Sequence, residues 1–358
     1  MDNNMAIVAE EREYLLGTEK IKFDSIIDEA ARMHDSFTNY TLDWTADKPS
    51  MYMDKDANLC FRSYGRKNAK KVDVTKYALG QAASYWKIPS SYLISLYDKG
   101  LNSLAIENID TLNAHNKAND RNMHGRVMVS DGVAEAVVSE RFAQNFPVCD
   151  VLDTIRTNID TSRYIPNQVF LSKSKMHIRF VDFDHKVKVG GEDMSVGFTC
   201  DSSDVGKSAL KVNFFLYKFA CRNGIVMVGK SNAGGRMAGT LYRQKHLGEA
   251  FDSDSIDRFI RCFDDIEILR QDGLDMIAQA QGRMMSEAEM TRIIDTCKKN
   301  YCSVDDTEKA KILELAADRY GRTKWGLING ITEVAQNHTL DDRIAYETWA
   351  GNILQFVA

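Results

Sequence analysis

The chain has 358 residues, of which 44% are hydrophobic and 27% are charged, and its net charge is −5. This composition is typical of a globular protein with a buried core, and it excludes fibrous and largely disordered chains. No apolar run approaches the roughly 20 residues of a membrane span, and no signal-peptide pattern opens the chain. The seven cysteines are odd in number and mostly far apart, unlike a secreted disulfide framework. We therefore expect a cytoplasmic protein with no membrane partner.

The N-terminal part of the chain predicts mainly helices. "KFDSIIDEAARMHDSF" repeats apolar residues at helical spacing, which indicates a helical arm over the first 45 residues. "SMYMDKDANLCFRSYG" predicts a short hairpin with its turn over 54–58. Helices are expected over "TKYALGQAASYWK" and from "IPSSYLISLYDKGL", the second with Pro89 near its first turn. These elements indicate a compact helical unit.

From about Arg126 the hydrophobic period changes from that of a helix to that of a strand. "GRVMVSDGVAEAVVSERF" predicts a hairpin that turns at Asp131-Gly132. "NQVFLSKSKMHIRFVDFDHKVKVGGEDMSVGFTC" continues as strands, with a further turn at Gly190-Gly191. After Gly248 amphipathic helices return and continue to the end of the chain.

These patterns predict an α+β fold: a central, mostly antiparallel sheet with an N-terminal helical unit and a C-terminal helical region. The predicted division of the chain is a helical arm over 1–45, an α+β core domain with basic segments over 46–250 and an acidic helical region over 251–358.

One predicted strand, "SKSKMHIRF", separates basic from apolar side chains. Side chains alternate along a strand, so one face carries four basic residues, namely Lys173, Lys175, His177 and Arg179. Ser174, Met176, Ile178 and Phe180 occupy the other face. Either the basic residues form a solvated outer face, or they form a surface that follows a phosphate backbone.

A second basic segment lies between Val205 and Gly248, where the sequence has no Asp or Glu. Its eight cations are Lys207, Lys211, Lys218, Arg222, Lys230, Arg236, Arg243 and Lys245. From Glu249 to the end, 21 acidic residues oppose 13 basic ones. This asymmetry predicts a basic working surface attached to acidic helices, which we expect to face away from it or to mediate assembly.

"GIVMVGKS", residues 224–231, matches the pattern of a phosphate-binding loop. Its middle residues are Ile225, Val226, Met227 and Val228, and β-branched residues resist the positive-φ bends that such a loop needs. The glycine-rich "NAGGRMAGT" that follows is a poor start for a helix. We predict a strand over residues 225–228, entered by a turn at Asn223-Gly224, and no nucleotide triphosphate site.

"SSDVGKSALKVNFFLYKFACRNGIV", residues 202–226, resembles the signature of a phage and plasmid family labelled domain of unknown function 932. That signature runs from an Asn-Ser-Glu-x-Gly element through a Phe-Leu-Tyr-Arg run to Cys-Thr-Asn-Gly-Met, and Arg222 departs from its Thr. "WKIPSSYL", "VVSERF", "YRQKHLG" and "WGLINGITE" resemble other family segments in the same order, so the resemblance spans roughly 75–337. It implies a mobile-element context and no particular reaction.

The first functional hypothesis is a non-catalytic protein that binds nucleic acid, most concretely single-stranded DNA, like phage annealing proteins in recombination or replication. It needs neither cofactor nor metal. Tyr217 and Tyr242 are candidates for base stacking, although Tyr217 also fits a core position. A homo-oligomer is implied by the likeness to annealing proteins alone. The predicted contact residues are Lys173, Lys175, His177, Arg179, Lys207, Lys211, Lys218, Arg222, Lys230, Arg236, Arg243 and Lys245.

Two other classes of function stay open. The chain can be a protein-interaction factor that counters host defence through its acidic helical part. It can also be an enzyme, for which "DFDH" offers Asp182, Asp184 and His185 as ligands of a divalent metal in nuclease chemistry. His246, Ser203 and Cys200 are among the other groups with catalytic chemistry.

Overall fold

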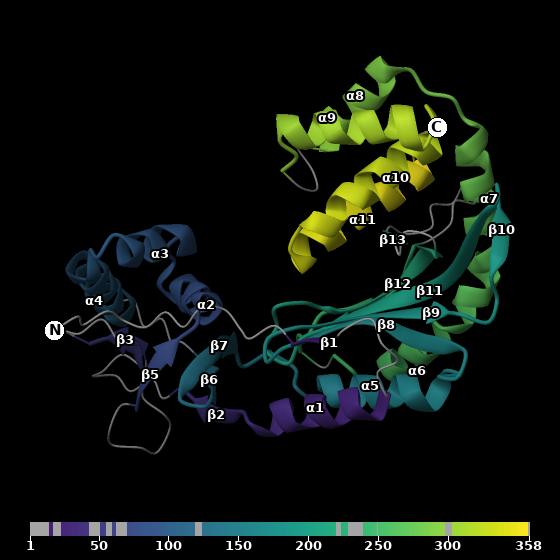
Figure 1. The fold of residues 1–358 in the computed structure, drawn as a ribbon. Helices are drawn as coiled ribbons and strands as arrows, with labels where there is room; N and C mark the ends of the chain where they lie inside the picture. Colours follow the sequence, from purple (N-terminus) through teal and green to yellow (C-terminus); the bar gives the residue numbers. More distant parts are fainter. Residues whose placement is uncertain are drawn as a thin grey trace.

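The computed structural model describes residues 14–16, 23–42, 51–54, 59–61, 70–118, 124–219, 223–227, 239–248, 250–297 and 303–356. Within these ranges the chain forms two sheets with helices packed against them, which confirms the predicted α+β class (Figure 1). No helix in these ranges has both the length and the apolar character needed to span a membrane.

The smaller sheet lies toward the N-terminal side of the molecule and has the order β2-β6-β7-β5-β4-β3. It is antiparallel except where β5 runs parallel to β7. Its strands are β2 (Thr38–Thr41), β3 (Met51–Met53), β4 (Leu59–Phe61), β5 (Lys70–Val74), β6 (Gly125–Ser130) and β7 (Val133–Ser139). The pairing of the hairpin predicted in "SMYMDKDANLCFRSYG" is confirmed, because β3 pairs with β4, whereas residues 55–58 of its predicted turn lie outside the described ranges. The sequence patterns did not reveal the six-stranded sheet that these strands build.

Three helices pack on the smaller sheet: α2 (Lys76–Trp86), α3 (Ser90–Asp98) and α4 (Asn102–Ala118) (Figure 1). Thr75 caps α2 by accepting a hydrogen bond from the Ala78 amide at 3.1 Å. Trp86 is fully buried, and its indole N–H donates to Asn113 Oδ1 at 3.0 Å, which ties α2 to α4. These three helices and the smaller sheet together form the small lobe.

The larger sheet has the order β1-β8-β9-β11-β12-β13, with β10 paired to β11 and β14 paired to β12. All its described pairs are antiparallel. Its strands are β1 (Tyr14–Leu16), β8 (Tyr164–Leu171), β9 (Met176–Asp182), β10 (Val187–Val189), β11 (Glu192–Ser202), β12 (Leu210–Lys218), β13 (Asn223–Val226) and β14 (Thr240–Gln244).

The turns predicted at Asp131-Gly132 and Gly190-Gly191 are confirmed by their backbone angles. Asp131 and Gly132 have φ of 51° and 81°, and Gly190 and Gly191 have φ of 57° and 87°. Positive φ at both central residues is the geometry of a two-residue turn that matches the twist of the strands. Asn-Gly, Asp-Gly and Gly-Gly pairs adopt it most readily, so these turns were visible in the sequence.

The larger sheet has an apolar face, on which Ile178, Phe198 and Phe214 lie in the main core. The helices on this face are α1 (Phe23–Asp35), α5 (Val148–Asn158) and α6 (Ser253–Arg261) (Figure 1). Phe23 of α1 meets Phe180 edge-on, with ring centroids 5.4 Å apart. Helix α7 (Asp264–Gly282) approaches the same core through Gly273, where a Cβ would lie 3.0 Å from Leu216.

The C-terminal helices are α8 (Glu287–Cys297), α9 (Asp306–Glu314), α10 (Lys324–Val334) and α11 (Leu340–Phe356). Short π-helical and 3-10 turns, Leu315–Arg319 and Ala335–Asn337, join the last three. These helices lie on the opposite side of the larger sheet from α1 and α5 (Figure 1). Gly351 brings α11 against β13, since a Cβ there would lie 2.1 Å from the Val226 carbonyl oxygen. Protein therefore covers part of the second face of the sheet as well.

A small apolar cluster joins the two sheets. It contains Met128, Ala136 and Val138 of the smaller sheet together with Phe142 and Val205, which lies beyond β11. The larger sheet and the small lobe are therefore in direct contact, and the cleft described next lies beside this contact.

Candidate functional site

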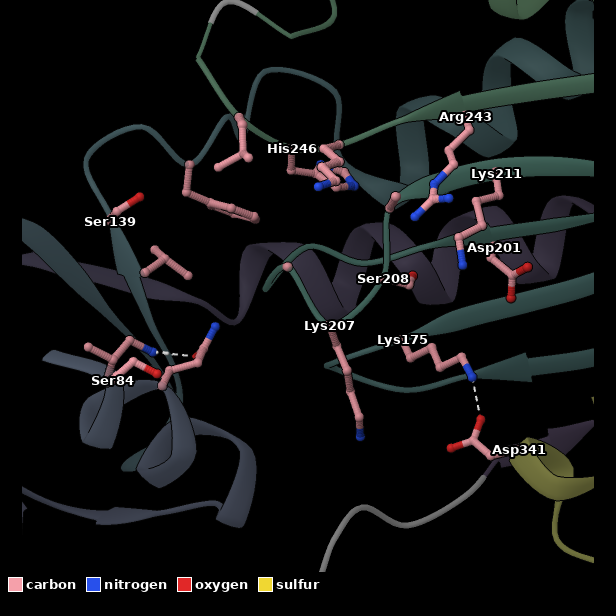
Figure 2. Close-up of a pocket in the computed structure, with 18 of the residues that line it drawn as sticks. Ser84, Ser139, Lys175, Asp201, Lys207, Ser208, Lys211, Arg243, His246 and Asp341 are labelled. Carbon is pink, nitrogen blue, oxygen red and sulfur yellow. Dashed lines mark hydrogen bonds and ion pairs between the residues drawn. The ribbon is translucent and has the colours of Figure 1, made fainter. Parts of the chain in front are cut away.

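A cleft of about 950 Å³ lies between the small lobe, the larger sheet and the start of α11. Figure 2 shows its cationic residues projecting from the larger-sheet side, with Ser84 and Ser139 on the small-lobe side. Five of the predicted contact residues line it: Lys175, Lys207, Lys211, Arg243 and Lys245. The structure thus brings together one residue of the predicted basic strand and four of the acid-free segment.

The register of the larger sheet builds the floor of the cleft. His177 of β9 is directly opposite Asp201 of β11, Asp201 is opposite Lys211 of β12, and Lys211 is opposite Arg243 of β14. Directly opposed residues of neighbouring strands point to the same face, so these four form one row across the sheet. Lys211 and Arg243 therefore project side by side into the cleft (Figure 2).

The loop between β11 and β12 supplies Lys207 and Ser208, and hydrogen bonds hold it in place. Ser203 Oγ donates to the Ser174 carbonyl at 2.6 Å and accepts from the Lys207 amide at 2.9 Å. Asp204 accepts from the Val148 amide at 2.8 Å, at the start of α5. The ammonium of Lys207 lies 5.9 Å from the ring centroid of Tyr77. The loop is thus fixed to both β8–β9 and α5.

Gly206 gives this loop its turn, and we expect Gly206→Ala to destabilise the protein by about 1–3 kcal/mol. Its φ is +83°, and a Cβ would lie 2.8 Å from Phe142 Cε2, so alanine both strains the backbone and displaces the ring. Urea denaturation measures the change. Gly191→Ala is the matched control, because Gly191 has a φ of +87° with nothing within 4 Å of its Cβ position. Equal losses in both variants would contradict a role for the Phe142 contact.

The segment after β14 supplies Lys245, His246 and Leu247. Its backbone is joined to residues 141–143, where the Ala143 amide donates to the His246 carbonyl at 3.2 Å and the Gly248 amide donates to the Arg141 carbonyl at 2.6 Å. His246 is buried and stacks on Phe142, with ring centroids 5.7 Å apart. Burial lowers the pKa of His246, so this imidazole is neutral at neutral pH and adds no charge to the cleft.

The charges of the cleft are only partly compensated. Lys175 forms an ion pair with Asp341 of α11. Asp201 Oδ1 lies within hydrogen-bond distance of His177 Nδ1, at 2.9 Å. Burial disfavours the charge of Asp201, but His177, Lys175 and Lys211 hold its pKa below the usual range. Within the described ranges, no ion pair with a carboxylate engages the other four cations, namely Lys207, Lys211, Arg243 and Lys245. The cleft therefore carries a net positive charge and suits an anionic ligand.

Two residues of the predicted basic strand do not form an open surface. The alternation is confirmed, because Met176, Ile178 and Phe180 lie in the main core and His177 and Arg179 point to the other face. However, His177 is 1% exposed and Arg179 is 0% exposed. Arg179 is paired with Glu347 of α11, 168 residues away in the chain, and lies over the Phe215 ring. The prediction of phosphate contacts by these two is wrong, because α11 covers Arg179 through Glu347 and His177 is buried against Asp201.

Two further predicted cations are engaged elsewhere. Lys218 is buried and bonds to Glu192 and to Asn329 Oδ1, the latter at 3.1 Å, so the prediction of a phosphate contact is wrong for it. Lys173 lies in the β8–β9 turn, outside the cleft lining, and pairs with Asp131 at 2.6 Å. Three other predicted residues lie outside the described ranges: Arg222, Lys230 and Arg236.

The aromatic candidates for base stacking are core residues. Tyr217 is 2% exposed and packs with Phe215 and Phe219. Tyr242 is buried and meets Phe259 edge-on at 5.3 Å. Neither ring is available to a base. The expectation that the acidic helices face away is also wrong for α11, since Asp341 and Glu347 pair with Lys175 and Arg179.

The structure gives the phosphate-loop match a different role. Residues Asn223–Val226 form β13, which is antiparallel to β12, and Ile225, Val226 and Met227 are buried. A phosphate loop would instead leave its strand and open a helix. The strand prediction is confirmed for Ile225 and Val226, whereas Asn223-Gly224 belongs to the strand and does not form a turn before it. Val228 lies outside the described ranges.

The groups suggested for catalysis serve other purposes in the described structure. Asp182 is fully buried and bound by Arg163, Arg270 and His185. Among the described residues, no group of three or more His, Cys, Asp or Glu side chains is arranged to hold a metal ion. Cys200 lies in the core, where burial raises the pKa of its thiol well above the usual range. These positions carry no argument for a reaction.

Sequence reasoning missed the small-lobe side of the cleft and Leu247. Gln81, Ser84 and Tyr85 come from α2, and Val137, Val138 and Ser139 come from β7. Nothing in their local pattern distinguishes them from ordinary helix and strand residues. Leu247 follows Lys245 and His246 in the basic segment, but the sequence does not show that its side chain is exposed.

A scan of the chain against protein-family models, a search of curated proteins and a search of solved structures each found no match. The resemblance to the phage and plasmid family of unknown function rests on the quoted motifs. The geometry and charge of the cleft carry the functional argument.

Proposed function

We propose that this chain binds nucleic acid, with single-stranded DNA as its preferred ligand, in the cleft between the small lobe and the larger sheet. The observation that carries the proposal is the convergence of Lys175, Lys207, Lys211, Arg243 and Lys245 on one cleft. Phosphate contacts by Lys and Arg supply most of the affinity of proteins that bind nucleic acid without sequence preference. Four of these cations form no ion pair in the described ranges, although Lys211 lies opposite Asp201 across the sheet, and they can make such contacts.

The dimensions of the cleft favour one strand over two. A volume of about 950 Å³ is within the range of sites that enclose a small ligand. Such a cleft encloses a short segment of a single strand, whereas a duplex presents two backbones that would remain outside it. A positively charged groove that follows one backbone is also the usual arrangement in proteins that bind single strands.

The biological setting is part of the proposal. The motif resemblance supports a phage or plasmid protein that acts on single strands during recombination or replication, in the cytoplasm of the host cell. The odd, dispersed cysteines fit a reducing compartment. Assembly into a homo-oligomer is proposed by likeness to annealing proteins.

Binding of a fluorescent oligonucleotide at low and moderate salt tests the proposal. We expect salt-dependent binding by the native protein and at least about a tenfold loss of affinity in the double variant Lys211→Ala, Arg243→Ala. If each residue contacts one phosphate, the slope of log affinity against log salt falls by about 1.4, which is twice the 0.7 expected per phosphate of a single strand.

Lys188→Ala is the matched control, because Lys188 is exposed on β10 of the same sheet and pairs only loosely with Asp193, at 3.6 Å. It should bind like the native protein. The proposal is wrong if the native protein shows no binding at low salt, or if the double variant keeps the native affinity and salt slope.

A further inference from the structure

Leu247 is an apolar side chain held in water at the edge of the cationic cleft. It is 52% exposed, and among the exposed large apolar side chains of the described ranges it is the one that lines the cleft. Single exposed leucines are common on protein surfaces and need no explanation. This one follows Lys245 by two residues and shares the cleft with four cations that form no ion pair in the described ranges, so its surroundings make it informative.

The exposure of Leu247 is fixed by its backbone. The Leu247 amide donates to the Lys245 carbonyl at 2.9 Å, and Leu247 forms an isolated antiparallel bridge with Phe142. The Gly248 amide donates to the Arg141 carbonyl at 2.6 Å. The neighbouring rings of Phe142 and His246 are buried and stacked on each other. Because the backbone at Leu247 is already ordered, a ligand that covers the side chain has to order only its rotamers.

The small-lobe side of the cleft is chemically different from the cationic side. Figure 2 shows Ser84 and Ser139 on the small-lobe side, while Lys211 and Arg243 project from the larger sheet. Ser84 and Ser139 are both exposed. The Ser84 hydroxyl donates to the Gly80 carbonyl at 3.2 Å and can still accept a hydrogen bond, and a serine hydroxyl such as that of Ser139 can donate or accept. The cleft thus combines charge on one side with apolar and hydroxyl groups on the other. A nucleotide has the same division, with phosphate at one end and a flat base with polar edges at the other.

We propose that Leu247 contacts the bases of the bound strand, with the phosphates against Lys211 and Arg243 and the base edges toward Ser84 and Ser139. This inference rests on the proposed function and names its ligand class more closely. The cleft recognises a strand that carries bases, and a polyanion without bases lacks the contacts to Leu247, Ser84 and Ser139. Packing of an apolar side chain on a base face is independent of sequence, because every base has such a face.

Comparison of oligo-dT with an abasic oligomer of equal length and equal phosphate number tests the inference. We expect the native protein to prefer oligo-dT by about fivefold or more, in line with the usual gain from base contacts. Leu247→Ala should reduce this preference to less than about twofold. Leu247→Tyr should raise it, because an aromatic ring stacks on a base better than leucine does.

Two controls separate the inference from the proposed function. Ile268→Ala removes an apolar side chain that is 70% exposed on α7, away from the cleft, and should leave the preference unchanged. Lys211→Ala should weaken binding of both oligomers and leave their ratio near the native value. Equal native affinities for the two oligomers, or a ratio that neither Leu247 variant changes, overturn the inference and leave the proposed function standing. Absence of binding to both oligomers overturns the two together.

Discussion

Replacing Glu347 by glutamine is expected to destabilise the protein by about 3–5 kcal/mol. Glu347 lies on α11, is 0% exposed and pairs with Arg179 of β9, which is also 0% exposed. It also accepts from Arg343 Nε at 3.1 Å. The glutamine variant keeps the shape of the side chain and removes its charge, which leaves a buried guanidinium without compensation. Urea denaturation, followed by circular dichroism, measures the loss.

The double variant Arg179→Met, Glu347→Leu should recover most of this stability, because replacing both buried ions by apolar groups removes both desolvation costs. Asp341→Asn is the matched control on the same helix. Asp341 pairs with Lys175, but its side chain is 68% exposed, so the loss should not exceed about 1 kcal/mol. A Glu347→Gln variant as stable as the control would show that the pair does not fasten α11 to the sheet.

The local structure around this pair was predictable from the sequence, because strand periodicity depends only on neighbouring residues. The alternation in "SKSKMHIRF" correctly separated Met176, Ile178 and Phe180 from His177 and Arg179. The turns at Asp131-Gly132 and Gly190-Gly191 were predictable for the same reason, since few residue pairs accept positive φ at two successive positions.

The packing of α11 against the polar face of β9 was not predictable from the sequence. Alternation shows which residues share a face, but not which distant element packs against that face. Glu347 lies 168 residues beyond Arg179, and "RIAYETW" has no feature that marks its glutamate as buried. Charged residues are usually assigned to the surface, and buried ion pairs are the main exception to that rule. Arg179, His177 and Lys218 were misjudged for this reason.

The candidate site was predictable in part. The absence of Asp and Glu between Val205 and Gly248 identified Lys207, Lys211, Arg243 and Lys245, all of which line the cleft. The acid-free segment contributes several cations to one cleft because β12 and β14 are hydrogen-bonded neighbours, so their outward cations lie in adjacent positions. The small-lobe side of the cleft comes from α2 and β7, more than 60 residues earlier in the chain. Only the tertiary fold brings it to this position.

Acid should weaken the protein through Asp182, a buried carboxylate that Arg163 and Arg270 hold. Asp182 is 0% exposed at the end of β9. Burial disfavours its charge, but hydrogen bonds from Arg163, His185 and Arg270 outweigh burial and lower its pKa to about 2, against 3.8 for an unperturbed carboxyl. These bonds join the residue before β8 and helix α7 to the end of β9, because Arg163 Nε donates to Asp182 Oδ2 at 2.8 Å and Arg270 donates to the same oxygen from α7.

The lowered pKa of Asp182 determines how stability changes with pH. Asp182 stabilises the folded state above pH 4, where it is ionised in both states, and this contribution is lost as the pH falls from about 4 to about 2. A difference of just under two pKa units corresponds to roughly 2.5 kcal/mol. Asp182→Asn should therefore lose about that much stability at pH 7 and show a smaller further loss between pH 4 and pH 2 than the native protein. Urea midpoints across this range measure both quantities.

Asp193→Asn is the appropriate control, because it removes a carboxylate from an exposed ion pair on the same sheet. Its stability should stay within about 0.5 kcal/mol of the native value. If Asp182→Asn follows the native stability curve at every pH, the arginine network does not hold a charged carboxylate. Asp182→Asn also bears on the nuclease hypothesis. Any loss of activity in this variant should follow its loss of stability, because Arg163 and Arg270 already bind the carboxylate that a metal would need.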